Sequence, residues 1–157
     1  MGEGGIPPPA AMFRGVSQLN LDAKGRLAMP ARYRDELVAS CDGQLVVTVH
    51  PDRCLLVYPR PEWERVEQNL MSRPNLKPAV VRLQRLLVGH ASDCELDGNG
   101  RLLLPQPLRK FAGMDKQVAL LGQGKKFEIW DQATWDQRCE EMFEDGIDTE
   151  ELESISL

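Results

Sequence analysis

The chain has 157 residues, 42% of them hydrophobic and 27% charged, with a formal net charge of −5. This length and composition are typical of a soluble globular protein with a modest core, and the absence of any run of about 20 apolar residues excludes a membrane-spanning helix. The charge is uneven, because residues 12–130 carry 18 Lys and Arg against 13 Asp and Glu, whereas residues 131–157 carry one Arg against 10 acids. A mildly basic body with an acidic tail is compatible with a nucleic-acid partner.

The N-terminal stretch over 1–11, MGEGGIPPPAA, is rich in Gly and Pro and lacks the basic and apolar regions of a secretory signal. We expect a flexible leader there, with Met12 as the more natural first residue. Alternating apolar residues over 16–21, resumed at Leu27 and Met29, predict a β-hairpin. Pro30 suits the start of a short helix.

That short helix is expected over 31–40. The sequence next favours strands over 44–49 and 54–58, followed by a helix over 59–71 that has Trp63, Val66 and Leu70 on one face. After a break at 72–78 it favours a second helix. In that helix Val80, Leu83 and Leu87 are expected to face inward, and Arg82 and Arg85 outward.

The same order of elements then restarts. The second half favours a hairpin over 94–105, a short helix over 106–113, strands over 117–122 and 126–130, and a last helix with Trp135, Cys139, Met142 and Phe143 at helical spacing. The chain beyond Asp145 is acidic and has no aromatic residue, which favours a frayed end.

An internal repeat explains this restart. The ten residues over 21–30, LDAKGRLAMP, recur over 96–105 as LDGNGRLLLP, at an offset of 75 residues. The segment over 58–63, YPRPEW, aligns with WDQATW over 130–135, at an offset of 72 residues. The change of offset fits a longer strand-to-strand loop in the first half. We therefore expect a duplicated β-hairpin–helix–hairpin–helix unit whose halves pack as a pseudo-dimer.

Each copy contains a D-x-x-G-R motif. The carboxylate can cap a turn by accepting bonds from backbone N–H groups, and the glycine supplies a positive φ. Two roles stay open for the aspartate: bracing the hairpin by pairing with the arginine, or a part in function. For Arg26 and Arg101 we expect exposure and function, because the guanidinium fork suits bidentate contacts with phosphate or guanine.

These segments resemble the MraZ family of bacterial transcriptional regulators, relatives of AbrB-type swapped-hairpin proteins. The resemblance rests on MFRG at 12–15, both D-x-x-G-R segments, YPRPEW, RLLVGHASDCELDGNGRLLLP and KFEIWDQATW, in that order. It implies an α+β fold, a mainly-β swapped-hairpin AbrB-like barrel of two tandem pseudo-symmetric repeats with flanking helices. The expected organisation is a leader over 1–11, a first repeat over 16–62, connecting helices over 63–90, a second repeat over 91–135, and a C-terminal helix with an acidic tail over 136–157.

The resemblance also implies a function. Such a protein is a cytoplasmic, nucleoid-associated repressor that forms ring-shaped homo-oligomers and binds short G-rich direct repeats in the promoter of the division and cell-wall gene cluster, which includes its own gene. The DNA-binding residues implied are Arg14, Lys24, Arg26 and Arg101, with Asp22, Gly25, Asp97 and Gly100 shaping the turns. Because Asn99 stands in the second copy where the first has Lys24, we expect the two turns to contact DNA unequally.

Enzymatic and metal-dependent functions are disfavoured. GHASDC at 89–94 gathers His, Ser, Asp and Cys, but catalytic triads assemble from distant segments, so we expect only a helix end and a strand start. The two histidines and four scattered cysteines lack an H-E-x-x-H or C-x-x-C pattern, which predicts no metal site. LGQGKKF lacks the G-K-[ST] ending of a phosphate loop, and no cofactor or small-molecule ligand is expected.

Two further expectations concern packing and partners. We expect four aromatic residues to pack at strand–helix junctions rather than to stack on nucleic-acid bases: Tyr58, Trp63, Trp130 and Trp135. We expect the four cysteines to be reduced: Cys41, Cys54, Cys94 and Cys139. The alternative function is an oligomeric scaffold that binds protein partners through its acidic C-terminal helix, with the Asp–Arg pairs purely structural.

Overall fold

The computed structural model describes residues 12–74 and 76–156, so the leader expected over 1–11 lies outside the described residues. The described chain mixes helices with antiparallel strands, which confirms the predicted α+β class. In chain order the elements are β1 (Phe13–Asn20), β2 (Arg26–Ala28), α1 (Ala31–Cys41), β3 (Gln44–Val49), β4 (Leu55–Pro59), α2 (Arg60–Met71), α3 (Pro78–Leu83), the π-helical turn η2 (Gln84–Val88), β5 (Ser92–Glu95), β6 (Arg101–Leu103), α4 (Gln106–Phe111), β7 (Gln117–Gly124), β8 (Lys126–Asp131), α5 (Gln132–Glu144) and α6 (Thr149–Ser154).

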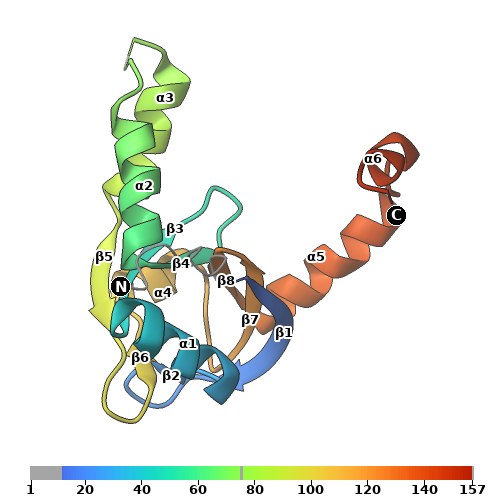
Figure 1. Ribbon diagram of the computed structural model, residues 1–157. Coiled ribbons are helices and arrows are strands. Elements are labelled where there is room, and N and C mark those ends of the chain that lie inside the picture. Colours follow the sequence, from blue (N-terminus) through green and yellow to red (C-terminus); the bar gives the residue numbers. More distant parts are fainter. Residues whose placement is uncertain (1–11, 75, 157) are drawn as a thin grey trace, which may run out of the picture.

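Six strands form one antiparallel sheet in the order β1-β7-β8-β4-β3-β5, and β2 pairs with β6 in a separate two-stranded ribbon (Figure 1). β1 and β5 are the two edges, and within the described residues they do not pair with each other. The sheet is therefore not closed, and the AbrB-like barrel implied by the resemblance is not confirmed. No helix in the described ranges is long and apolar enough to span a membrane.

The strand order reflects the duplication. β1 corresponds to β5, β3 to β7 and β4 to β8, so the order is the same when it is followed from either edge. β1 of the first repeat pairs with β7 of the second, and β5 of the second repeat pairs with β3 of the first. The two repeats are therefore interleaved and share one sheet.

The two predicted hairpins are wrong as self-contained units. β2 does not extend a ladder with β1; it pairs with β6 of the other repeat, with Leu27 opposite Leu102. The physical reason is burial, because Leu27, Met29, Leu102 and Leu104 are at most 2% exposed. A ribbon built from both repeats places these side chains over one shared core, whereas a lone hairpin would leave them partly in water.

One cluster of buried side chains fills the space between the sheet, the ribbon and helices α1 and α4. Three aromatic rings tie its elements together: the centroid of Phe127 lies 4.3 Å from that of Phe13 and 5.0 Å from that of Tyr33. The Tyr33 hydroxyl is satisfied by donating to the carbonyl of Arg14. This core holds α1, β1 and β8 in place and so supports the ribbon.

Two helical arms leave this body in different directions (Figure 1). The first contains α2, α3 and η2, and the second contains α5 and α6. Trp63 and Leu70 of α2 are buried as predicted, but Leu83 is exposed, as are Met142 and Phe143 of α5. The predicted inward orientation is wrong at Leu83, and the apolar residues at helical spacing in α5 are exposed at Met142 and Phe143, because the ends of both arms extend past the sheet. The predicted fraying beyond Asp145 is also wrong, since α6 forms there.

Candidate nucleic-acid interface

The first D-x-x-G-R turn is held by Asp22. Its Oδ1 accepts the backbone N–H groups of Lys24 at 3.0 Å and Arg26 at 2.9 Å, and its Oδ2 accepts Nε of Arg26 at 2.6 Å. Two backbone bonds between Asp22 and its neighbours close the turn, from Gly25 N–H to Asp22 O and from Asp22 N–H to Arg26 O. The aspartate therefore both caps the turn and braces the arginine.

The second turn repeats this geometry around Asp97. Its Oδ1 accepts the backbone N–H groups of Asn99 at 2.8 Å and Arg101 at 2.9 Å. The arginine is held less closely here, since Nε of Arg101 lies 3.7 Å from Oδ2 of Asp97. The turn predicted from the motif is thus present twice, with a tighter Asp–Arg pair in the first copy.

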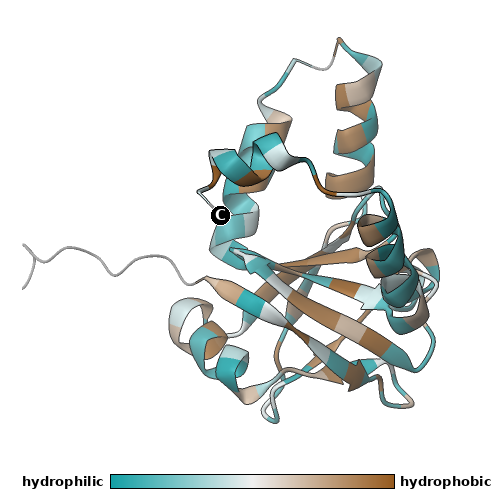
Figure 2. Cartoon of the chain, turned by 90° about the vertical axis from the view of Figure 1, so that its right-hand side faces the viewer, coloured by the Kyte–Doolittle hydropathy of each residue, from teal (hydrophilic) through white to brown (hydrophobic). Residues whose placement is uncertain are grey.

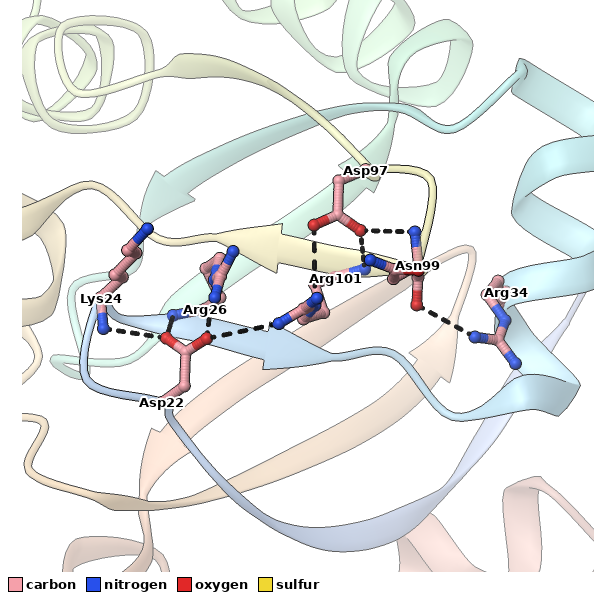
Figure 3. Close-up of polar contacts among 7 residues, drawn as sticks. All are labelled: Asp22, Lys24, Arg26, Arg34, Asp97, Asn99 and Arg101. Carbon is pink, nitrogen blue, oxygen red and sulfur yellow. Dashed lines mark hydrogen bonds and ion pairs between the residues drawn. The ribbon is translucent and has the colours of Figure 1, made fainter.

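The two turns, 75 residues apart in sequence, lie at opposite ends of the antiparallel β2–β6 ribbon, and Arg26 and Arg101 lie between them (Figure 3). Nη1 of Arg101 lies 3.9 Å from Oδ2 of Asp22, so the first aspartate faces arginines of both repeats. The side chains of Arg26 and Arg101 are 28% and 34% exposed. We call the surface that Lys24, Arg26, Asn99 and Arg101 form along the ribbon, from one turn to the other, the ribbon tip.

Not all predicted DNA-binding residues meet at the ribbon tip. Lys24 is exposed on the first turn. Arg14 is also exposed, but it lies near the start of β1, and the turn follows the other end of that strand. Six residues of strand separate the two, about 20 Å at 3.3 Å per residue. The structure therefore assembles three of the four predicted residues and leaves Arg14 apart.

Two arginines that the motif analysis did not single out as site residues cross between the repeats. Arg34 of α1 lies over Gly100, and its Nη1 donates to the carbonyl of Asn99 at 3.2 Å. Arg109 of α4 lies over Gly25 in the same way. Both arginines recur at the offset of 75, and that recurrence was the available signal. Each turn is therefore supported by a side chain of the other repeat.

Replacing Gly100 with Ala is expected to destabilise the fold for two reasons. The φ of Gly100 is +74°, a left-handed conformation that costs about 1–2 kcal/mol for a residue with a Cβ. An added Cβ would also collide with the Arg34 side chain near Cδ, and overpacking of this kind adds about 1–3 kcal/mol. The free energy of unfolding, measured in urea, should fall by the sum of both effects.

Gly113 supplies the matched control, because its φ is +61° and an added Cβ would have no described atom within 4 Å. Gly113→Ala should show only the backbone cost. In an Arg34→Ala background, the cost of Gly100→Ala should drop to that of Gly113→Ala, since the double-mutant cycle removes the collision. An unchanged cost in that background would mean that Arg34 does not press on the turn.

The turn carboxylates are shifted toward the charged form. The pKa of Asp22 is lowered from 3.8 to about 2, first because the backbone N–H of Arg26 donates to it, and further through the Arg26 side chain and the backbone of Lys24. The pKa of Asp97 is also lowered, chiefly by the backbone N–H of Arg101. Both turns are therefore built around ionised carboxylates.

A pH dependence follows from the lowered pKa of Asp22. Because the folded-state pKa lies below the unfolded value of 3.8, the ionised carboxylate stabilises the fold above that value, and this contribution is lost as the pH falls toward about 2. Asp22→Asn removes the titration. The difference in urea midpoint between the native protein and Asp22→Asn should therefore shrink between pH 4 and pH 2; a difference that stays constant would contradict this.

The other candidate residues of the sequence have structural surroundings. The ring centroids of Tyr58 and Trp63 lie 5.5 Å apart, and those of Trp130 and Trp135 lie 5.8 Å apart, at equivalent strand–helix junctions. This confirms packing for the aromatic residues. The segment 89–94 directly follows the end of η2 at Val88 and contains the start of β5 at Ser92, which agrees with the expected helix end and strand start.

All four cysteines are unpaired, and burial raises the pKa of the Cys54 thiol to about 12. Within residues 12–74 and 76–156, no group of three or more His, Cys, Asp or Glu side chains is placed to hold a metal ion.

Comparison with known proteins matches this duplicated architecture. The model of the family described as "MraZ protein, putative antitoxin-like" matches the chain twice in tandem, over residues 12–86 and 87–154. The "Transcriptional regulator MraZ" of Thioalkalivibrio sulfidiphilus is 64% identical over 150 residues, covering 93% of this chain and 100% of its own length. The protein of the same name from Methylococcus capsulatus is 58% identical over 144 residues, covering 92% of this chain and 94% of its own length. The one from Halorhodospira halophila is 53% identical over 152 residues, covering 93% of this chain and 100% of its own length. The chain therefore belongs to the MraZ family, whose curated relatives are named transcriptional regulators.

Proposed function

We propose that this chain is a sequence-specific DNA-binding transcriptional regulator that uses the ribbon tip to contact double-stranded promoter DNA. The observation that carries the proposal is the clustering of Lys24, Arg26 and Arg101 on one ribbon, built jointly by the two repeats. The names of the relatives support the regulatory role.

The geometry of Arg26 suits recognition of a base edge. Asp22 engages its Nε at 2.6 Å, and within the described residues neither terminal nitrogen of the guanidinium donates a hydrogen bond. Those nitrogens are the pair that a bidentate contact with guanine O6 and N7 requires. Asp22 therefore acts as a positioning residue that leaves the terminal nitrogens of Arg26 available for a base edge.

We further propose that the protein acts as a ring-shaped homo-oligomer. The body over 12–130 carries a net charge of only +5, which limits the phosphate contacts that one copy can make. Several copies side by side on short G-rich direct repeats would make up for this. Repression of the division and cell-wall gene cluster, including its own gene, would then follow from occlusion of the promoter, in the cytoplasm at the nucleoid.

A salt series of gel shifts tests DNA binding. The native protein should shift a duplex carrying G-rich direct repeats, more weakly as salt rises, because counterions compete for the phosphates. Lys24→Ala should weaken binding and make the salt dependence shallower. Lys125→Ala, an exposed lysine between β7 and β8, is the matched control and should bind like the native protein. An absent shift at low salt, or equal losses in both variants, would overturn the proposed use of the ribbon tip.

A further inference from the structure

An open pocket of about 600 Å³ lies beside the first D-x-x-G-R turn. We call it the turn pocket. Its volume is within the range of about 300–1,000 Å³ that is usual for small-molecule sites. The lower end of the body, where the ribbon lies, has mostly hydrophilic loops in Figure 2, whereas the strands above it contain many hydrophobic residues. The lining combines both kinds of side chain: Leu21, Asp22, Arg109, Met114, Asp115 and Lys116.

Backbone hydrogen bonds fix the walls of the turn pocket. The N–H of Leu21 donates to the carbonyl of Lys116 at 2.7 Å, and the N–H of Met114 donates to the carbonyl of Arg109 at 3.0 Å. Nε of Arg109 donates to the carbonyl of Leu104, which follows β6, also at 3.0 Å. The end of β1, the chain after α4 and the end of β6 are therefore tied together, and the pocket is preformed.

The turn pocket lies where the two repeats differ. α1 has 11 residues but its counterpart α4 has only 6, so the chain leaves α4 early and 112–116 forms one wall. The arginines that lie over the two turns differ as well. Nη1 of Arg34 donates to the carbonyl of Asn99, whereas within residues 12–74 and 76–156 the terminal nitrogens of Arg109 donate no hydrogen bond. Arg109 therefore keeps its fork for a ligand.

The turn pocket presents two cations. Arg109 is partly buried and Lys116 is exposed, and in the described part of the chain neither forms an ion pair with a carboxylate. Of the two carboxylates in the lining, Asp22 is already bonded to Arg26, which leaves Asp115 as an exposed acid. This balance favours a ligand with one acidic group.

We propose that the turn pocket binds a small molecule in which one oxyanion group is joined to an apolar body, and that this ligand weakens DNA binding. A guanidinium binds the oxygens of a phosphate or carboxylate through two parallel hydrogen bonds. The oxyanion group is therefore held by Arg109 and Lys116, and the apolar body lies against Leu21 and Met114. The effect on DNA rests on the proposed function, whereas the binding site itself does not.

The ligand acts on DNA through the first turn. The guanidinium of Arg109 lies directly over Gly25, the residue between Lys24 and Arg26, and Asp22 lines the pocket. A bound anion therefore places negative charge beside the turn whose cations attract DNA phosphates. Ligand and DNA should weaken each other's binding by the same factor, about 5-fold or more. The factor should decrease as salt rises, because salt screens the repulsion.

Isothermal titration calorimetry without DNA tests the site, with phenyl phosphate as the probe. Inorganic phosphate and phenol supply its two halves separately. Phenyl phosphate should bind more tightly than either, because only the whole molecule reaches both the cations and the apolar wall. The absence of heat at millimolar phenyl phosphate would overturn the proposed site. Equal affinity for phenyl phosphate and inorganic phosphate would overturn the apolar part of it.

Charge variants locate the bound probe by the sign of their effects. Lys116→Gln should weaken the binding of phenyl phosphate by about 2–5-fold, whereas Asp115→Asn should tighten it by a similar factor. Arg109→Gln should weaken it by about tenfold or more, with a urea midpoint to establish that the variant is folded. Lys110→Gln, an exposed lysine outside the lining, is the matched control and should leave the affinity unchanged. Effects of the same sign at 115 and 116, or an equal loss in Lys110→Gln, would overturn the location.

Anisotropy on the multi-repeat duplex tests the effect on DNA. Saturating phenyl phosphate should lower the DNA affinity of the native protein more than inorganic phosphate does at equal ionic strength, and Lys116→Gln should require more of it. A probe that binds in the calorimeter without changing DNA affinity overturns the regulation. Protein that binds the probe but no DNA refutes only the proposed function, and protein that binds DNA but not the probe refutes only the turn pocket.

Discussion

Reducing the DNA from several direct repeats to one is expected to weaken binding by about 10²–10⁴-fold. In a ring, once the ribbon tip of one copy has bound DNA, the ribbon tips of the adjacent copies are held close to the next repeats. Their binding is then an intramolecular step. The gain requires repeats spaced to match adjacent tips, about 34 Å if they lie one helical turn apart. One tip has only three cations, so its own affinity should be low and only shallowly dependent on salt.

Fluorescence anisotropy with multi-repeat and single-repeat duplexes at one salt concentration measures this effect. A variant that native mass measurement finds to be monomeric is the control, because a monomeric protein should bind both duplexes with the same low affinity per site. If the unmodified protein binds a single repeat as tightly as the full array, or if a monomeric variant keeps the affinity of the ring for the array, multivalency does not account for binding.

Arg26→Ala is expected to lower DNA affinity more than Arg101→Ala. The loss of a bidentate base contact costs about 1–3 kcal/mol. Arg26 has the tighter positioning bond to its aspartate, 2.6 Å against 3.7 Å for Arg101, and it is two residues from Lys24, whereas Arg101 is two residues from the neutral Asn99. Both features favour the first turn as the stronger contact.

The comparison uses anisotropy on the multi-repeat duplex, with urea midpoints to establish that both variants are folded. Arg26→Lys keeps the charge and removes the fork, so it should lose sequence preference while retaining most of the salt-dependent affinity. Equal losses in the two alanine variants would refute the asymmetry, and a full retention of preference by Arg26→Lys would refute the bidentate contact.

Local features of the protein were predictable from its sequence. The two turns follow from D-x-x-G-R, because an aspartate two and four residues before its backbone donors and a glycine with positive φ specify that turn through contacts only a few residues long. The duplication and the order of its elements follow from the offsets of 75 and 72. The family was also identifiable from these segments, and the two tandem matches over 12–86 and 87–154 confirm it.

Partnerships between distant segments were decided only by the tertiary structure. Hydrophobic alternation shows that Leu27 and Leu102 face a core, but it carries no information on which strand lies beside each, so alternation alone could not predict the pairing of β2 with β6. The placement of Arg34 over Gly100 depends on that exchange. Helical periodicity likewise predicts an apolar face at Leu83 and Phe143, whereas their exposure arises because the arms extend beyond the sheet that could have covered them. Periodicity is a property of neighbours along the chain, and burial is a property of neighbours in space.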